Sequence, residues 1–328
     1  MQGVLTVGAA FLLSVAGTRL VIDWLKARDL VAVENERTMH LGAVPQGGGV
    51  AVVTAILLSL VVFWPWTGTL AVVVPVTVGL ASLSAWNDWR DIAFPVRLAA
   101  HMVAAGAVIA LVPLGPVFGG AVPVWLERVV LGLGLVWFIN LTNFMDGIDG
   151  ITGVEMISIA GGVIAVRQVA GGGSEFDGLT FAILGASAGF LVWNWQKARI
   201  ILGDVGSIPF GLMTGAILID IAARQSLAAA LILPLYYLTD ATLTLLRRLF
   251  RGESVWRAHR EHAYQRAAGA IGSHAEVVKR IAVCNGVLIG AAVLAVERPW
   301  AGIVVAVAAV GILMWHLETL AGRQSKVA

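Results

Sequence analysis

Charge is scarce in this chain. Only 13% of its 328 residues are Asp, Glu, Lys or Arg, whereas soluble domains contain about 25%. The formal net charge is +2, and no basic cluster interleaved with aromatic residues indicates a nucleic-acid partner. The single cysteine, Cys284, excludes an intrachain disulfide. The longest polar stretch, residues 251–279, is too short to form a second domain with its own core.

Apolar residues, by contrast, make up 59% of the chain, and the mean hydropathy is +0.87. A membrane-spanning helix needs about 20 apolar residues. The pattern therefore predicts an all-α polytopic membrane protein, with one domain over residues 1–328 and about eleven transmembrane helices. These helices are expected at residues 4–22, 48–64, 70–86, 96–111, 126–142, 154–169, 179–195, 208–221, 227–249, 277–296 and 301–320.

Most of the 22 Lys and Arg residues fall in alternate loops between these helices. Because cytoplasmic loops carry the excess of positive charge, the N-terminus is expected on the periplasmic side and the C-terminus in the cytoplasm. The same loops carry the polar motifs. The cytoplasmic loops that should build a site are residues 23–47, 87–95, 143–153, 196–207 and 250–279.

The most informative motif is the run NLTNFMDGIDG at residues 140–150, which lies between two apolar segments. It contains two carboxylates, Asp146 and Asp149, and uncompensated carboxylates are costly at the edge of a hydrocarbon layer. An oxygen-rich site of this kind suits Mg²⁺ or Mn²⁺ rather than zinc. The run therefore predicts a bound cation together with a phosphorylated ligand.

Two further acidic motifs precede or follow expected spans. Asn87, Asp88 and Asp91 end the third span, and the two aspartates would share a face of a continuing helix and could bind one cation. A solvated helix end is the alternative. Asp204 and Ser207 come before the eighth span, where unpaired N–H groups favour an anion such as a diphosphate. Simple helix capping is compatible with that interpretation.

Basic and imidazole groups occur in two other cytoplasmic loops. His259, His262 and Arg266 follow an i, i+3, i+7 pattern, which predicts one face of a helix that binds phosphate; a solvated basic helix is the alternative. Arg37 and His40 precede a glycine run and are also candidates for phosphate binding, although the signal of this loop alone is weak.

Charged and imidazole side chains also occur inside the expected spans. Arg19 and Asp23 are four residues apart and are expected to form a pair along a helix. Asp240 is either functional or paired with Arg247, two turns away. His101 is expected to be a satisfied interior histidine.

Taken in order, these motifs resemble those of the polyprenyl-phosphate N-acetylhexosamine-1-phosphate transferase superfamily, and the resemblance covers nearly the whole chain. The runs NFMDGIDG at residues 143–150 and HREHAYQ at residues 259–265 are most similar to the bacterial branch that starts O-antigen and related polysaccharides. The resemblance implies transfer of N-acetylhexosamine 1-phosphate from a UDP-sugar to undecaprenyl phosphate, with release of UMP. It also implies a multi-pass protein of the bacterial inner membrane with a cytoplasmic active site.

The resemblance implies roles for individual residues as well. Asp204 and Asp149 are expected to bind Mg²⁺, with Mn²⁺ as the alternative, and Asp88 and Asp146 are expected to join them as catalytic residues. Membrane lipid is an expected partner, and a homodimer is one option because dimers are common among relatives. The expected substrate-binding residues are Arg37, His40, Asn87, Asp91, Asn143, Asn194, Ser207, His259, His262 and Arg266.

Three departures from the family pattern matter. Asn87 stands where relatives usually have an aspartate, so that position cannot supply a general base. Ile201 replaces an aromatic residue suited to stacking on uracil, and Gln196 and Lys197 replace a proline-rich segment. Two other functions stay open: a transporter of an ion or phosphorylated solute, and a catalytically silent scaffold. A transporter is expected to place polar groups near the middle of the membrane, whereas this chain concentrates them at one face.

Overall fold

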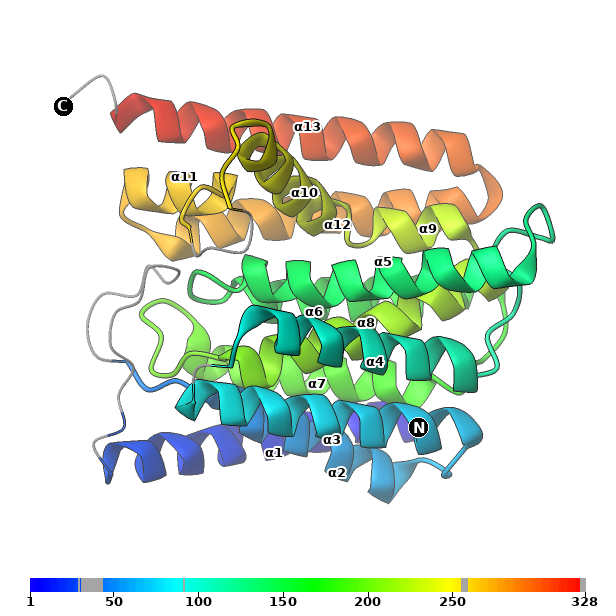
Figure 1. Cartoon of the computed structure of the whole chain (residues 1–328), viewed down its shortest axis with the longest axis horizontal. Helices are drawn as coiled ribbons and strands as arrows, with labels where there is room; N and C mark the ends of the chain where they lie inside the picture. The colour runs from blue at the N-terminus through cyan, green and yellow to red at the C-terminus, as the bar shows by residue number, and fades with distance from the viewer. Residues whose placement is uncertain (29, 31–43, 91, 255–258, 325–328) are drawn as a thin grey trace.

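The computed structural model describes residues 1–28, 30, 44–90, 92–254 and 259–324, and within them the chain is helical (Figure 1). The only β-type pairing among these residues is an isolated bridge between Gln46 and Ile201. The helices are α1 (Gln2–Lys26), α2 (Gly48–Phe63), α3 (Gly68–Trp89), α4 (Phe94–Leu111), α5 (Val124–Met145), α6 (Ile151–Ala170), α7 (Asp177–Asn194), α8 (Asp204–Arg224), α9 (Leu227–Ile232), α10 (Leu235–Phe250), α11 (Ala263–Ile271), α12 (His274–Glu297) and α13 (Pro299–Gln324).

Eight helices of the described chain are long and apolar enough to cross a membrane. They are α1, α3, α4, α5, α6, α8, α12 and α13, and α2 is a shorter apolar helix. The polytopic all-helical architecture is therefore confirmed. The count of about eleven spans and the orientation of the termini stay predictions.

The expected continuous span at residues 227–249 is wrong, because the structure divides it into α9 and α10 at Leu233 and Pro234. Proline has no backbone N–H to donate, and its ring clashes with the preceding helical turn. The chain therefore leaves the first helix and begins the second with a new axis.

Helix α8 is the centre of the bundle. It is the most buried of the eight apolar helices, whereas α1, α4 and α5 are the least buried. It packs against α3 and α5 and also against α2 and α9. The connections from α3 to α4, from α5 to α6 and from α7 to α8 all lie at one end of the bundle, where α11 also lies (Figure 1). The polar motifs of separate loops are thereby brought to the same end.

Close backbone contact fixes the first turn of α8 against the first turn of α2. The backbone N–H groups of Gly47 and Gly48 donate to the carbonyl of Ile201 at 3.1 and 3.0 Å, and that of Gly49 donates to Leu202 at 2.9 Å. A Cβ atom on Gly49 would overlap the backbone nitrogen of Gly206. Only glycine at this position lets the two helices approach so closely.

We expect Gly49→Ala to destabilise the protein by about 1–3 kcal/mol, because the added methyl group has no room against backbone atoms. The measurement is the thermal unfolding midpoint of the purified protein in detergent. Gly79→Ala in α3 is the matched control, since a Cβ there meets no atom within 4 Å. Equal midpoints for the two variants would contradict the role of this contact.

Candidate active site

The carboxylate of Asp204 is the meeting point of several helices at the polar end of the bundle. It belongs to the first residue of α8 and accepts from Asn143 Nδ2 of α5 at 2.7 Å and from Asn87 Nδ2 of α3 at 3.3 Å. Arg97 of α4 places its Nη1 3.5 Å from the same carboxylate. The amide of Asn143 also donates to Ser207 Oγ at 2.9 Å. Predicted site residues of α3, α5 and α8 therefore do come together.

Asp88 lies beside this group. Its Oδ1 accepts from Gln46 Nε2 at 3.4 Å, and its Oδ2 would be 3.5 Å from a Cβ built on Gly203. Its negative charge interacts with that of Asp204. The side chain of Asp88 is exposed, whereas Asp204 is partly buried. Two carboxyl groups from different helices thus lie near each other, and one of them is exposed.

Asn87 uses both ends of its amide. Its oxygen accepts from the backbone N–H of Ile92 at 3.0 Å, which closes the turn after α3, and its nitrogen donates to Asp204. An aspartate at this position would have no hydrogen to donate and would repel the Asp204 carboxylate. The departure from the family pattern therefore has a physical consequence: it supplies a donor where relatives carry a negative charge.

The turn after α5 forms a second, separately bonded group. Asp146 Oδ1 accepts from Thr152 Oγ1 at 2.6 Å. Asp149 is buried, and its Oδ2 accepts from the backbone N–H of Ala198 at 3.1 Å. Asn194 Oδ1 accepts from the N–H of Gly150 at 2.9 Å. These bonds tie the turn to the segment that follows α7.

These contacts separate the two aspartates that the sequence assigned to a metal. Asp204 is bonded to Asn143, Asn87 and Arg97, whereas the bonds of Asp149 described above go to the segment after α7. No group of three or more His, Cys, Asp or Glu side chains in the described chain is arranged to hold a metal ion. Whether Asp149 binds a metal therefore stays a prediction, while its place in the turn is a finding.

The prediction that His259, His262 and Arg266 lie on one helical face is wrong. Helix α11 begins at Ala263, with His262 as its N-cap, so both histidines precede the helix. The reason is Asp240, whose carboxylate accepts from the backbone N–H groups of Ala263 at 3.0 Å and Tyr264 at 3.3 Å. These bonds fix the start of the helix.

Asp240 is therefore a helix cap and not the partner of Arg247, which donates to Glu318 at 3.0 Å. His262 is only 2% exposed, and its Nδ1 lies 3.5 Å from Asp240 Oδ1. The ring of His259 lies 4.9 Å from that of His262, centroid to centroid. Arg266 donates to the backbone carbonyl of Glu261 at 3.1 Å and pairs with Glu318 of α13.

The start of α11 docks on the end of α5 and on the turn that follows it. Tyr264 Oη donates to the carbonyl of Phe144 at 3.1 Å. A Cβ on Gly147 would overlap Tyr264 Oη, so glycine is needed for this close approach. The motifs at residues 143–150 and 259–265 are thereby joined, as the ordered set of motifs implied.

Two of the remaining predictions concern pairs and interior residues. Arg19 and Asp23 form the expected pair, with Nε 2.9 Å from Oδ2. His101 is buried, as expected, but its Nδ1 has no hydrogen-bond partner within the described chain, so the prediction of a satisfied histidine is wrong at that atom. Three predicted substrate-binding residues, Arg37, His40 and Asp91, lie outside the described residues.

Sequence reasoning missed three residues of this region: Gln46, Arg97 and His274. Gln46 directly precedes the glycine run of the first loop, and Arg97 is one of the 22 Lys and Arg residues whose distribution predicts the orientation. A search for a cation to balance Asp204 could have found Arg97. His274, whose Nδ1 lies 3.2 Å from the backbone nitrogen of Asp149, gives no recognisable signal in the sequence.

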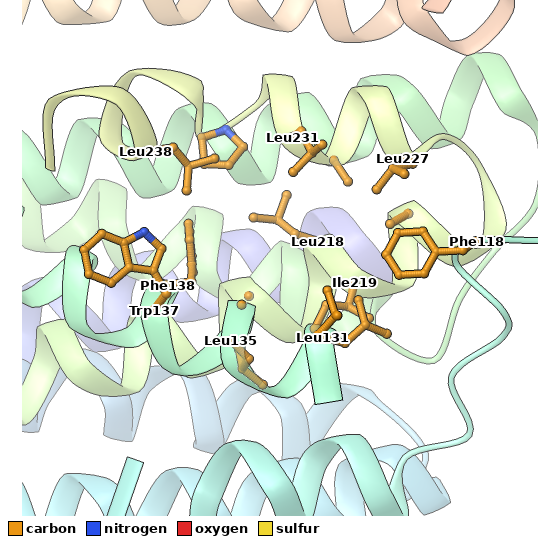
Figure 2. Close-up of a pocket in the computed structure, with 16 residues that line it drawn as sticks. Phe118, Leu131, Leu135, Trp137, Phe138, Leu218, Ile219, Leu227, Leu231 and Leu238 are labelled. Carbon is orange, nitrogen blue, oxygen red and sulfur yellow. The ribbon is translucent and has the colours of Figure 1, made fainter. Parts of the chain in front are cut away.

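An apolar groove with a volume of about 320 Å³ lies between α5, α8, α9 and α10 (Figure 2). Phe118 lies at one end of the groove and Trp137 at the other, with leucines such as Leu218 and Leu231 between them. A second cavity, of about 230 Å³, shares Trp137 with the groove and is also lined by Asn140 and Phe144. The second cavity therefore brings an apolar lining up to the run that contains Asn143.

Comparison with known proteins finds a family model that matches part of this chain. The model of glycosyl transferase family 4 matches residues 69–222, which run from α3 into α8 and include Asn87, Asn143 and Asp204. The chain is similar to this family over that stretch. The match covers the helices that carry the Asp204 group, so the family likeness and the site geometry concern the same part of the molecule.

Curated relatives in the family include transferases from several bacteria. A probable undecaprenyl-phosphate N-acetylglucosaminyl 1-phosphate transferase of Bacillus subtilis is 24% identical over 247 residues, which cover 71% of this chain and 68% of the relative. The phospho-N-acetylmuramoyl-pentapeptide-transferase of Streptococcus suis is 28% identical over 64% of this chain and 68% of the relative. That of Streptococcus sanguinis is 30% identical, but the chain spans only about half of its length.

The ion pairs of Glu261, which precedes α11, predict how the stability of the protein depends on pH. Burial alone would raise the pKa of Glu261, but the hydrogen bond from Arg251 and the charges of Arg248 and Arg251 hold it below its ordinary value of 4.5. A depressed carboxyl pKa means that the carboxylate stabilises the fold above about pH 4.5, and that this contribution is lost as the pH falls through the folded-state pKa. We therefore expect Glu261→Gln to lower the unfolding midpoint at pH 7 and to have less effect near pH 4.

The measurement is the thermal midpoint of both proteins between pH 7 and pH 4. Glu297→Gln, at the exposed end of α12, is the control and should follow the wild type throughout. A difference between wild type and Glu261→Gln that stays constant across this range would show that the ion pairs of Glu261 do not contribute to stability.

Proposed function

We propose that this protein transfers N-acetylhexosamine 1-phosphate from a UDP-sugar to undecaprenyl phosphate, releasing UMP and leaving an undecaprenyl-diphospho-sugar in the membrane. The observation that carries the proposal is the Asp204 group, which gathers three polar side chains from three other helices at the polar end of the bundle. The names of the relatives support it, since the Bacillus subtilis protein is a sugar 1-phosphate transferase that acts on undecaprenyl phosphate.

In this reaction a phosphate oxygen of the lipid attacks the phosphorus that bears the sugar. A new P–O bond forms between the two phosphates, and the P–O bond to UMP breaks. A phosphate monoester has a second pKa of about 6, so its attacking oxygen is mostly ionised at neutral pH. Catalysis then depends on holding the two anionic substrates together. Asn87 need not act as a base, and Asp88 can either contact the lipid phosphate or remove a remaining proton.

Arg97 is the cationic side chain beside Asp204. Its guanidinium donates toward the carboxylate at 3.5 Å and would be drawn to a phosphate placed at the start of α8. The first turn of α8 presents backbone N–H groups that favour an anion. Asn143, which donates to both Asp204 and Ser207, holds this turn in place. These residues would position the diphosphate.

The donor set fits Mg²⁺, with Mn²⁺ as the alternative. Mg²⁺ is usually held by one or two carboxylates together with substrate phosphates and water. Asp204 would be the first ligand, and the exposed Asp88 beside it is better placed than the buried Asp149 to be the second. When bound, the ion would neutralise charge on the diphosphate. Asp146 and Asp149 would shape the nucleotide side of the site.

The apolar groove provides a place for the prenyl chain. It lies among helices that would be surrounded by lipid, and the adjoining cavity reaches Asn140 and Phe144 in the motif that holds Asn143. A lipid whose tail lies in the groove would have its phosphate near the polar end of the bundle. This arrangement fits a substrate with a hydrocarbon tail and a phosphate headgroup.

We further propose that the reaction starts assembly of O-antigen or a related polysaccharide at the cytoplasmic face of the bacterial inner membrane. The motifs at residues 143–150 and 259–265 support this branch of the family. The sugar is an N-acetylhexosamine: N-acetylglucosamine, N-acetylgalactosamine or a 6-deoxy sugar such as N-acetylquinovosamine or N-acetylfucosamine. By analogy, residues 251–279 select it.

Asp204→Asn should reduce UMP release from a UDP-N-acetylhexosamine and polyprenyl phosphate by at least about 100-fold, because it removes a charged group at the centre of the site. Removal of divalent cations with EDTA should have the same effect in the wild type, and Mg²⁺ should restore activity. The assay uses purified protein in detergent with a panel of UDP-sugars.

Asp23→Asn is the control, since Asp23 is an exposed carboxylate paired with Arg19. Full turnover by Asp204→Asn would overturn the proposal. Absence of UMP release from the wild type with every donor would favour the catalytically silent scaffold.

Gly134→Leu should raise the KM for long-chain polyprenyl phosphate and leave the KM for the UDP-sugar unchanged. Gly134 lines the groove, and a Cβ there meets no atom within 4 Å, so the new side chain can fill the groove without disturbing the backbone. Gly311→Leu on the exposed face of α13 is the matched control. Equal effects of the two substitutions on the lipid KM would exclude the groove as the site of the prenyl chain.

A further inference from the structure

The turn at residues 146–150 is held by a side chain that belongs to none of the motifs. His274 is the first residue of α12, and its Nδ1 lies 3.2 Å from the backbone nitrogen of Asp149 and 3.3 Å from Asp149 Oδ2. Asp149 and His274 are 125 residues apart in the chain. The contact therefore depends on how α12 docks, and not on local sequence.

The start of α12 is itself fixed in place. Gln196 Oε1 accepts from Ser273 Oγ at 3.0 Å and from the backbone N–H of Ala275 at 2.6 Å. Ser273 also caps the helix by accepting from the N–H of Glu276 at 3.3 Å. The residues on both sides of His274 are thus bonded to the segment after α7. With a side chain only 14% exposed, the imidazole is confined beside Asp149.

The hydrogen bond defines what His274 supplies. The N–H of Asp149 is a donor, so Nδ1 acts as the acceptor of this hydrogen bond. Asn194 does the same for the next residue, accepting the N–H of Gly150 at 2.9 Å. Two successive peptide groups of the turn are thus oriented by side chains from α7 and α12. The turn that carries Asp146 is therefore held by these two acceptors.

We propose that His274 is a positioning residue for the transfer site: its Nδ1 orients the Asp149 peptide and thereby sets the shape of the turn that carries Asp146 and Asp149. The proposal rests on the proposed function in that the turn borders the site. In this role His274 acts through the backbone of the turn, in contrast to the phosphate binding expected of His259 and His262.

The experiment compares His274→Ala, His274→Asn and His316→Ala in the full-length protein. Asparagine presents its amide oxygen about where Nδ1 stands, so it can accept the same N–H, whereas alanine cannot. His316 of α13 accepts from Arg280 Nε at 3.2 Å, away from the turn, and is the matched control. The readouts are kcat and KM for UMP release, the unfolding midpoint, and hydrogen exchange of peptides that contain residues 146–152.

We expect His274→Ala to lower kcat on the order of 10- to 100-fold, because small displacements of positioned groups cost that much. Amide exchange of the turn should rise, and the unfolding midpoint should match that of the control. His274→Asn should restore most of kcat and most of the protection. A loss of kcat without a loss of thermal stability, reversed by asparagine, separates positioning of the turn from general stabilisation of the fold.

Wild-type kcat and wild-type exchange in His274→Ala would overturn the proposal. So would equal losses of kcat and of the unfolding midpoint in both the alanine and asparagine variants, since that result describes a residue needed only for stability. If the wild type releases no UMP, the proposed function fails, and the exchange data alone still decide whether His274 holds the turn.

Discussion

Polar groups at the end of this apolar helix bundle need hydrogen-bond or ion-pair partners, and the structure depends on meeting that need. Helix α8 is nearly enclosed by its neighbours, yet its first residue is Asp204, a carboxylate. Asn143, Asn87 and Arg97 meet this requirement from three different helices. The bonds that stabilise the carboxylate also fix the relative positions of α3, α4, α5 and α8. Under the proposed function, the contacts that stabilise Asp204 are also the ones that would arrange the site for its ligand.

Most of the helices could be predicted, because the hydrocarbon core imposes a length and a composition that appear directly in the sequence. The break at Pro234 is a local effect that the expected span overlooked. The start of α11 could not be derived from spacing, because it is set by Asp240, a residue of the preceding helix. The sequence indicated which loops carry polar residues. It could not show that Asp204 meets Asn143 whereas Asp149 meets Ala198, since those pairings arise only from packing.

Asn87 shows how a departure from a family pattern can be understood through its contacts. Replacing a carboxylate by an amide removes one negative charge near Asp204 and Asp88 and adds a donor that bonds to Asp204. The acceptor half of the amide still closes the turn after α3. The local backbone is therefore maintained while the electrostatic balance of the site shifts. A site with less negative charge favours the approach of anionic substrates and attracts a cation less strongly.

The segment between α10 and α11 is anchored at both ends. Arg248 of α10 pairs with Glu261 and with Glu253, and Asp240 caps α11. Because these bonds bring the two helices together, the sequence between the anchors can change in length or composition at a small entropic cost. If residues 251–279 select the sugar donor, as proposed above, then substitutions in this one segment would change the donor preference and leave the contacts of Asp204 intact.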